Sequence, residues 1–361
     1  MREAINVTQT FLPSMEEYNS YLTKIWDSKW LTNRGALVLE LEDKLKHFLS
    51  LDFLTLTTNG TLPLQIAIKA LELKGEIITT PFSYVATTAS IVWEGCKPVF
   101  VDIDPEYLTI DETKIEAAIT DKTCAILATH VFGNPCDVDT IERIAEKHNL
   151  KVIYDAAHCF GVNYKGKSLL SYGDVSTCSF HATKIFHTGE GGCWVTNSKE
   201  IQDKLYYHHN FGHNGPETFH GLGINAKMSE FQAAMGLSVF PHLDEIFNSR
   251  KAAVEIYRNE LNNLPVATLK VRSETDWNYH YFPAIFESEA ILLKVMVALK
   301  EENIFPRRYF YPSLNTVEYT KGDAMPISES VASRILCLPL FTGIESEDVQ
   351  RICAIIKKSI L

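Results

Sequence analysis

The chain has 361 residues, of which 46% are hydrophobic and 22% are charged. This length and composition predict a globular protein with one large domain or two coupled domains. The 45 acidic residues outnumber the 34 basic residues, which gives a formal net charge of -11. Such a charge argues against a nucleic-acid-binding surface and favours small-molecule partners.

The first residues contain no basic segment that leads into an apolar run, and no uninterrupted apolar stretch is long enough to span a bilayer. We therefore expect neither export nor a membrane partner, and a cytoplasmic location. The eight cysteines are scattered without CxxC pairs. Buried free thiols are expected in preference to disulfides or a metal site.

Short β-rich runs alternate with longer segments of helical period between about residues 53 and 197. Most of these runs are continuously apolar, as strands covered on both faces are. The predicted strands are 53–58, 76–80, 98–103, 124–132, 151–155, 175–180 and 193–197. Helices are predicted between several of them, and the alternation indicates an α/β fold with a doubly wound, mainly parallel seven-stranded sheet between helices.

The pattern changes after Gly236. A long amphipathic helix is predicted at about 241–263, followed by a strand at 279–286 and helices at 288–303 and 346–360. These elements predict a smaller α+β unit. We therefore divide the chain into a large domain at 1–240 and a small C-terminal domain at 241–361.

Ligands of open α/β sheets bind beyond the carboxyl ends of the strands. After the strand at 53–58, Gly60 and Thr61 precede a helix that has Pro63 in its first turn. Free N–H groups at such a terminus make a phosphate site. A capped helix without a ligand is the alternative.

Two further strand ends carry informative residues. Asp155 ends an apolar strand and His158 follows three residues later. A buried carboxylate needs a partner such as a protonated ring nitrogen, although Asp155 could instead cap a following helix. Tyr84, at a strand-to-helix corner, could stack on a flat ring or pack in the core.

The stretch SFHATKIFHTGEGG (179–192) places Lys184 between an apolar run and a glycine-rich turn. A lysine near the core has a lowered pKa, which suits a Schiff-base amine or a proton shuttle, whereas a lysine on a turn could simply reach solvent. Together the helix terminus, acid, aromatic ring and lysine fit pyridoxal 5′-phosphate. A dinucleotide site is disfavoured because no GxGxxG follows a strand.

The sequence resembles the DegT/DnrJ/EryC1/StrS family of sugar aminotransferases, which have the fold of type I pyridoxal-phosphate enzymes. The resemblance extends over nearly the whole chain, in order. It is carried by NGT (59–61), TPFSYVAT (80–87), FVDID (100–104), HVFGNPCDVD (130–139), YDAAHCFG (154–161), SFHATK (179–184), GEGG (189–192), GINAKMSEFQAAMG (223–236) and LPLFTGIESEDV (338–349).

The resemblance implies a role for each matching residue. Lys184 would bind the cofactor aldehyde, Asp155 would pair with the ring nitrogen, and His158 would lie near the ring hydroxyl. Tyr84 would stack on the ring. The phosphate would be held by Gly60, Thr61, Ser179 and, from the other subunit of a homodimer with shared active sites, Asn225.

The resemblance further implies transfer of an amino group from L-glutamate to a nucleotide-linked keto sugar, for surface polysaccharide such as O-antigen lipopolysaccharide. The variant SFHATK followed by EGG is most similar to enzymes that aminate C4 of a 4-keto-6-deoxyhexose, with the dTDP-linked sugar favoured. Enzymes that form GDP-linked perosamine share TGEGG and are an alternative. Enzymes that aminate C3 more often read SFYPGK.

A sugar diphosphate requires local positive charge or aromatic contacts, although each candidate could equally be a surface or packing residue. These substrate candidates are Arg34, His181, His187, Glu190, Lys227, Arg307, Arg308, Tyr309 and Tyr311. Lys227 stands where the family usually has arginine. Lysine keeps the charge but lacks the bidentate fork.

The sequence argues against two other functions. A sugar 3-dehydratase of the family would have histidine in place of Lys184. A non-catalytic cofactor- or sugar-binding regulator should have lost part of the set formed by Lys184, Asp155, Thr61 and Ser179, all of which are present.

Overall fold

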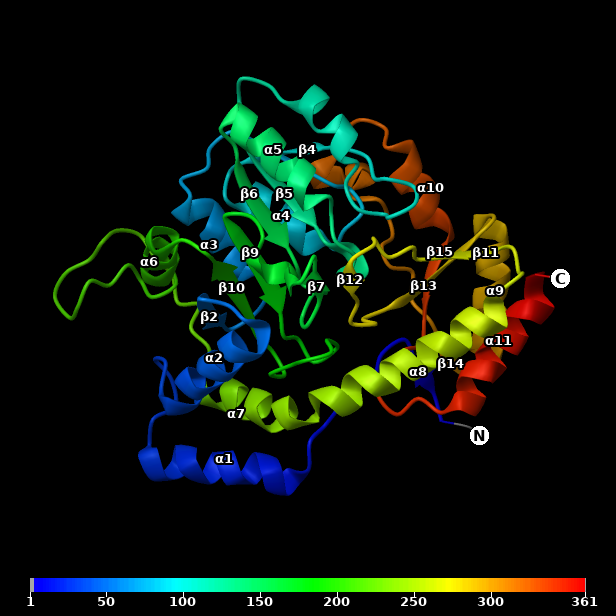
Figure 1. Cartoon of the computed structure of the whole chain (residues 1–361), viewed down its shortest axis with the longest axis horizontal. Coiled ribbons are helices and arrows are strands. Elements are labelled where there is room, and N and C mark those ends of the chain that lie inside the picture. The colour runs from blue at the N-terminus through cyan, green and yellow to red at the C-terminus, as the bar shows by residue number, and fades with distance from the viewer. Residues whose placement is uncertain (1–2, 361) are drawn as a thin grey trace.

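The computed structural model describes residues 3–360. Its larger unit is built on a seven-stranded sheet with the order β2-β10-β9-β6-β5-β3-β4 (Figure 1). The strands are β2 (Phe53–Thr57), β3 (Glu76–Thr79), β4 (Lys97–Phe100), β5 (Thr123–Thr129), β6 (Lys151–Asp155), β9 (Val175–Ser179) and β10 (Gly192–Thr196). β10 is antiparallel to both of its neighbours, and the other pairs are parallel. The predicted mainly parallel seven-stranded sheet is confirmed.

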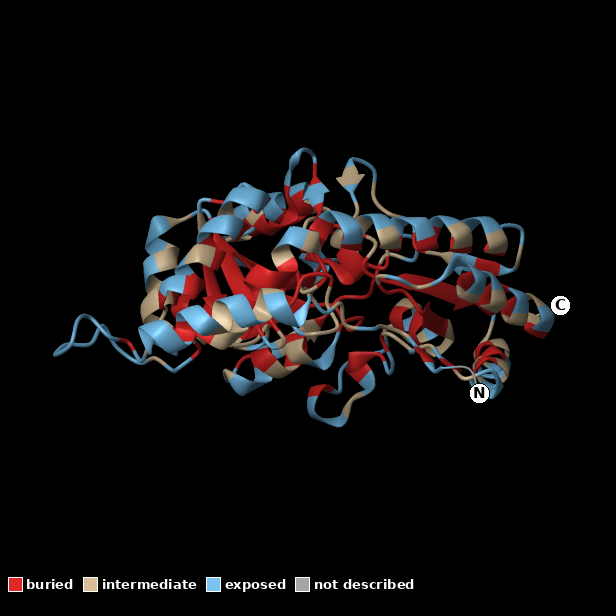
Figure 2. Cartoon of the chain, turned by 90° about the horizontal axis from the view of Figure 1, so that it is seen from below, coloured by how far each residue is buried: buried red, intermediate tan, exposed pale blue. Residues whose placement is uncertain are grey.

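Helices cover both faces of this sheet, because the strands are apolar on both sides. Ile126 of β5 faces a core formed with one set of helices, whereas Leu127 faces a second core on the opposite side. Figure 2 shows the buried sheet between exposed helices. The first set is α2 (Ala36–Leu49), α5 (Val138–His148) and α7 (Glu230–Val239), with α1 (Met15–Ser28) outside it, and the second is α3 (Leu62–Ala70), α4 (Val85–Trp93) and α6 (Lys199–His208).

The smaller unit is an antiparallel sheet covered by helices and has its own core. Its elements are β11 (Val266–Thr268), β13 (Phe282–Phe286), β15 (Ile335–Leu338), α9 (Glu289–Glu301), α10 (Pro326–Arg334) and α11 (Ser346–Ile360). The N-terminal strand β1 (Ile5–Asn6) joins this unit by pairing in parallel with β14 (Ile304–Phe305).

The two units are connected by continuous structure. Helix α8 (Leu243–Leu261) runs from the large unit to the small one (Figure 1), close to the bounds expected for it. A second connection is a small sheet in which β12 (Thr275–Asp276) pairs with β7 (Asn163–Tyr164), which in turn pairs with β8 (Lys167–Ser168).

The strands predicted at 98–103, 124–132 and 279–286 are each shorter than expected, since β4 ends at Phe100, β5 ends at Thr129 and β13 begins at Phe282. β5 ends at Thr129, whereas the apolar run continues to Phe132. The chain turns here because Phe132 adopts a left-handed conformation with φ of 56° and donates its N–H to His158 Nδ1 at 3.1 Å. The turn places His158 against the end of the sheet.

Across residues 3–360, no helix is both long and apolar enough to cross a bilayer. In the same range no cluster of three histidine, cysteine or acidic side chains is arranged to hold a metal ion. The eight cysteines are free thiols, and all but Cys124 are buried.

Candidate active site

The residues singled out from the sequence come from strand ends that meet at one edge of the sheet. β2, β9, β6, β5 and β3 all run in the same direction. Their carboxyl ends therefore lie side by side, which is where open α/β sheets bind ligands.

Asp155 ends β6 and is buried. Its Oδ2 accepts a hydrogen bond of 2.6 Å from Thr87 Oγ1, and its Oδ1 accepts one of 3.1 Å from the Ala157 N–H. Burial raises the pKa of Asp155, while these bonds and the positive charge of Lys184 oppose the rise. No helix begins here, so the structure excludes the alternative in which Asp155 caps a helix.

Lys184 lies in the turn between β9 and β10. The turn is anchored by Ile185 and Phe186, which are buried, and the Phe186 ring stacks on Phe160 with centroids 4.7 Å apart. Lys184 is partly buried, and desolvation lowers its pKa to about 8 while the charge of Asp155 opposes that shift. This environment favours the partly desolvated amine over the alternative of a fully solvated lysine.

His158 presents a neutral ring at the same edge. It lies nearly parallel to Phe132 and Phe310, and burial lowers its pKa well below the usual value. Because Nδ1 accepts the Phe132 N–H, the neutral tautomer carries its proton on Nε2. His158 is thus a fixed donor rather than a base.

In the segment between β2 and α3, the Asn59 side chain takes two of the N–H groups that the sequence suggested for a phosphate. Asn59 Oδ1 accepts the N–H groups of Thr61 and Leu62, so the Thr61 side chain does not cap the helix. Gly60 lies directly against Ser179, since a Cβ built on Gly60 would be 2.7 Å from the Ser179 Cβ. The two predicted phosphate-holding segments therefore meet.

Aromatic side chains and one arginine lie near Lys184 and Asp155. Tyr84 precedes α4 and is 51% exposed. Lys184 Nζ lies 6.0 Å from the centroid of the Tyr281 ring, which is 5.5 Å from that of Tyr309. The Arg307 guanidinium stacks on Tyr309 at 4.3 Å, and its charge further lowers the Lys184 pKa.

Asn225 and Lys227 lie on a segment next to the end of β2. Lys227 Nζ donates to Asn225 Oδ1 at 2.7 Å and lies 4.8 Å from the centroid of the Phe211 ring. Asn225 itself is exposed. The Ala226 carbonyl between them accepts the Thr58 N–H, which ties this segment to the sheet edge.

Two of the substrate candidates are committed to other contacts. Arg34 forms an ion pair with the buried carboxylate of Glu42. Arg308 bonds to Glu289 Oε1 at 2.6 Å and to a backbone carbonyl, while its guanidinium lies over the Tyr311 ring.

The histidines of the Lys184 turn differ from each other. Both ring nitrogens of His187 bond to backbone, Nε2 to the Phe11 carbonyl at 2.6 Å and Nδ1 to the Gly189 N–H. His181 is exposed, with Nδ1 2.9 Å from Thr183 Oγ1 and Nε2 3.7 Å from Glu190 Oε1. His187 therefore braces the turn, whereas His181 faces solvent.

Two residues of this site were not identified from the sequence. Thr87 closes the stretch TPFSYVAT, and its position one helical turn after Tyr84 could have indicated that it faces the same edge. Tyr281 lies in the strand predicted at 279–286, where no local pattern distinguishes an active-site ring from a core ring.

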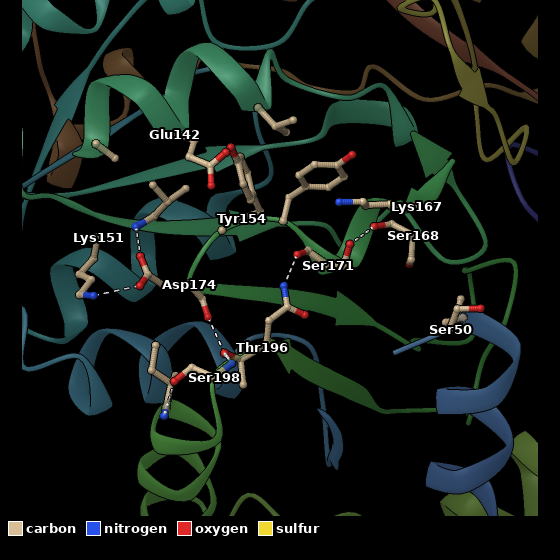
Figure 3. Close-up of a pocket in the computed structure, with 18 of the residues that line it drawn as sticks. Ser50, Glu142, Lys151, Tyr154, Lys167, Ser168, Ser171, Asp174, Thr196 and Ser198 are labelled. Carbon is tan, nitrogen blue, oxygen red and sulfur yellow. Dashed lines mark hydrogen bonds and ion pairs between the residues drawn. The ribbon is translucent and has the colours of Figure 1, made fainter. Parts of the chain in front are cut away.

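A cavity of about 1100 Å³ lies elsewhere on the large unit (Figure 3). Its lining includes Lys151, at the start of β6, and Asp174, whose carboxylate holds the Lys151 ammonium at 3.0 Å. Tyr154 also lines it, but successive side chains of a strand point to opposite faces, and neither Asp155 nor Lys184 is among the lining residues. The cavity is therefore separate from the Lys184 site.

The sequence pattern of the DegT/DnrJ/EryC1/StrS aminotransferase family matches residues 14–357. The chain belongs to this family. A dTDP-4-amino-4,6-dideoxy-D-glucose transaminase of Shigella dysenteriae is 44% identical over 99% of the chain and 100% of its own length. A GDP-perosamine synthase of Vibrio cholerae is 33% identical over 96% of the chain and 97% of its own length. The crystal structure of DesI with its TDP-sugar product superposes with a TM-score of 0.94 at 32% identity, covering 99% of this chain and 93% of DesI.

Pyridoxal 5′-phosphate is the cofactor of these DegT-family aminotransferases, and the residues present fit it. Lys184 offers an amine that is readily deprotonated, and Asp155 offers a buried carboxylate whose partners in the chain leave room for a cation. The Thr61 hydroxyl is free of the helix cap, and the absence of a Cβ at Gly60 lets the chain lie directly beside Ser179.

Proposed function

We propose that this aminotransferase moves the amino group of L-glutamate to C4 of dTDP-4-dehydro-6-deoxy-D-glucose and so forms dTDP-4-amino-4,6-dideoxyglucose. The proposal is supported most by a lysine with a pKa lowered to about 8 and a buried carboxylate that lie at one sheet edge and influence each other's pKa. Perturbed ionisable groups of this kind are typical of catalytic sites.

Lys184 is the group that moves protons in this proposal. When bound, pyridoxal 5′-phosphate supplies an aldehyde that carries the amino group and a ring that withdraws electrons. Lys184 Nζ removes the proton from Cα of glutamate and, in the second half of the reaction, delivers a proton to C4 of the sugar. An amine with a pKa of about 8 is suited to both directions near neutral pH.

The remaining side chains hold and orient the reactants. Asp155 keeps the ring nitrogen protonated through its negative charge, and His158 donates from Nε2 to the ring hydroxyl. Gly60, Thr61 and Ser179 form the phosphate cradle.

The choice of sugar rests on the identities of the relatives. The transaminase that acts on the dTDP-linked amino sugar is 44% identical, whereas the GDP-perosamine synthase is 33% identical. Arg307 lies near Lys184, has no carboxylate partner among the described residues, and stacks on Tyr309. It is suited to bind an anionic group of a substrate.

We also infer a homodimer with shared active sites, in which Asn225 reaches the cofactor phosphate of the partner subunit. The exposure of Asn225 supports this inference. A further consideration is that Phe219 and Leu222, on the loop that projects between α6 and α7, expose 61% and 67% of their surface (Figure 1). Such apolar exposure favours a contact with another chain.

The product would serve surface polysaccharide biosynthesis, such as that of O-antigen lipopolysaccharide, and the reaction would take place in the cytoplasm. Support for this setting comes from the sequence resemblance. The nucleotide-linked substrate is consistent with it.

The proposal is tested by following the visible absorbance of the cofactor-loaded protein. Glutamate should abolish the band, and dTDP-4-dehydro-6-deoxy-D-glucose should restore it. Lys184→Ala should bind the cofactor without either response. Lys165→Ala is the control, because Lys165 is paired with Asp139 at the protein surface. A band that survives glutamate in the unaltered protein would contradict the proposal.

A further inference from the structure

Asp155 is supported from behind by a chain of buried hydroxyl groups. Thr87 Oγ1 donates to Asp155 Oδ2 at 2.6 Å and lies 2.7 Å from Ser83 Oγ. Ser83 Oγ is in turn 3.0 Å from Thr129 Oγ1. The three hydroxyl residues are at most 4% exposed, so solvent does not compete for these bonds.

The hydrogen bonds of this chain have one direction. An ionised carboxylate only accepts hydrogen bonds, so the single hydroxyl proton of Thr87 is donated to Asp155. Thr87 must then accept from Ser83, and Ser83 must accept from Thr129. Bonds aligned in this way polarise one another and strengthen the final bond to the carboxylate.

The chain links separate elements of the sheet edge. Thr129 ends β5 and is the direct neighbour of Asp155 in the parallel β5–β6 pair. Ser83 lies in the turn after β3, and Thr87 lies in the first turn of α4, which begins just after Tyr84. The carboxylate that faces the cofactor and the helix that carries Tyr84 are therefore held in one fixed arrangement.

We propose that Thr87 is a positioning residue which, backed by Ser83 and Thr129, keeps Asp155 charged and aimed at the ring nitrogen of the cofactor. This inference rests on the proposed function. Burial alone favours the protonated form of Asp155, and a protonated carboxyl group could not pair with a pyridinium. Donation by Thr87 to the carboxylate offsets that effect.

The adjacent residue shows that this arrangement is specific. Thr88 is as buried as Thr87, but its hydroxyl donates to the Val85 carbonyl within its own helix at 3.3 Å. Threonine to valine at either position preserves shape and removes one hydroxyl. Thr88→Val is therefore a matched control for Thr87→Val.

The test measures cofactor affinity of the apoprotein and the kinetics of the loaded enzyme. Thr87→Val should weaken pyridoxal-phosphate binding and lower kcat by about tenfold each, the size expected when a hydrogen bond to a charged group is lost. KM for glutamate and for the sugar should stay within about twofold, because neither touches Thr87. Thr87→Ser should restore both values, and Thr88→Val should match the unaltered protein.

The proposal would be overturned if the Thr87→Val and Thr88→Val variants had the same cofactor affinity and the same kcat. If Thr87→Val fails to fold, Ser83→Ala tests the proposal instead. This change leaves the Thr87 hydroxyl in place but removes the Ser83 hydroxyl that donates to it. Ser83→Ala should weaken cofactor binding by about threefold, and no change would contradict the proposal. If the unaltered protein does not react with glutamate, the proposed function fails, while cofactor affinity still tests the role of Thr87.

Discussion

Lys184 has the reactivity that the proposed reaction requires because of where the turn places it. A lysine with its ordinary pKa of 10.5 has roughly one neutral amine in three thousand at pH 7, whereas a pKa of about 8 leaves roughly one in ten neutral. Burial produces this change, and the charge of Asp155 limits it. The neutral amine is the form that attacks an aldehyde or takes a proton.

This pKa predicts how the reactivity of Lys184 depends on pH. In the apoprotein, acylation of Lys184 should accelerate about tenfold per pH unit below 8 and level off above it, because the neutral fraction is then nearly complete. Mass spectrometry of the peptide that carries Lys184 measures the rate. Asp155→Asn should move the midpoint to lower pH, since the carboxylate stabilises the ammonium. A rate that still rises near pH 10 would contradict the account.

The sequence alone indicated the residues of the candidate site more readily than the residues that support them. Asp155 ends β6, while Thr61 and Lys184 lie in the turns that follow β2 and β9, and a position at or just after the end of a strand indicates the ligand edge. Position along the sequence could not show which of the neighbouring residues Arg307 and Arg308 lies near Lys184. Arg308 is bound to Glu289 while Arg307 stacks on Tyr309 near Lys184, and that difference depends on residues distant in sequence.

Most elements of the fold followed from local patterns. Apolar runs predicted the seven strands, and helical periodicity predicted α8 within two residues at each end. The antiparallel placement of β10 and the pairing of β1 with β14 were not predicted. Pairing partners depend on packing between distant segments, which local propensity does not encode.

Helix α8 holds the small unit through a buried hydrogen bond that can be tested. Tyr257 is buried, its ring stacks on Phe282, and its hydroxyl donates to the Pro339 carbonyl at 2.8 Å. Tyr257→Phe should lower the free energy of unfolding by about 1–2 kcal/mol, because it leaves that carbonyl without a donor. Chemical denaturation of the apoprotein measures the change.

Tyr319→Phe provides the control for the α8 experiment. Tyr319 is 50% exposed, so the same chemical change there removes a hydroxyl that water can solvate. Its effect should stay within about 0.5 kcal/mol. Equal effects of the two substitutions would show that the bond to Pro339 contributes nothing to stability.

The whole molecule has apolar surface that a single chain leaves uncovered. Trp93 at the end of α4 is 81% exposed, and Trp26 of α1 is 66% exposed. The loop between α6 and α7 projects from the body of the large unit (Figure 1). These features are consistent with the proposed dimer, in which each subunit completes the site of the other.

The shared site predicts complementation between inactive subunits. Lys184→Ala and Asn225→Ala should each be nearly inactive alone. Random mixing makes half of the dimers mixed, each with one intact site, so the refolded mixture should recover about a quarter of the unaltered activity. Recovery no greater than the sum of the two separate variants would contradict the shared site.

The most direct measurement is the fate of the amino nitrogen. The cofactor-loaded enzyme is given isotopically labelled L-glutamate with equal amounts of dTDP- and GDP-linked 4-keto-6-deoxyhexoses, and the products are analysed by NMR. We predict labelled nitrogen on C4 of the dTDP-linked sugar. Label on the GDP-linked sugar, label on another carbon, or no transfer of label would contradict this prediction.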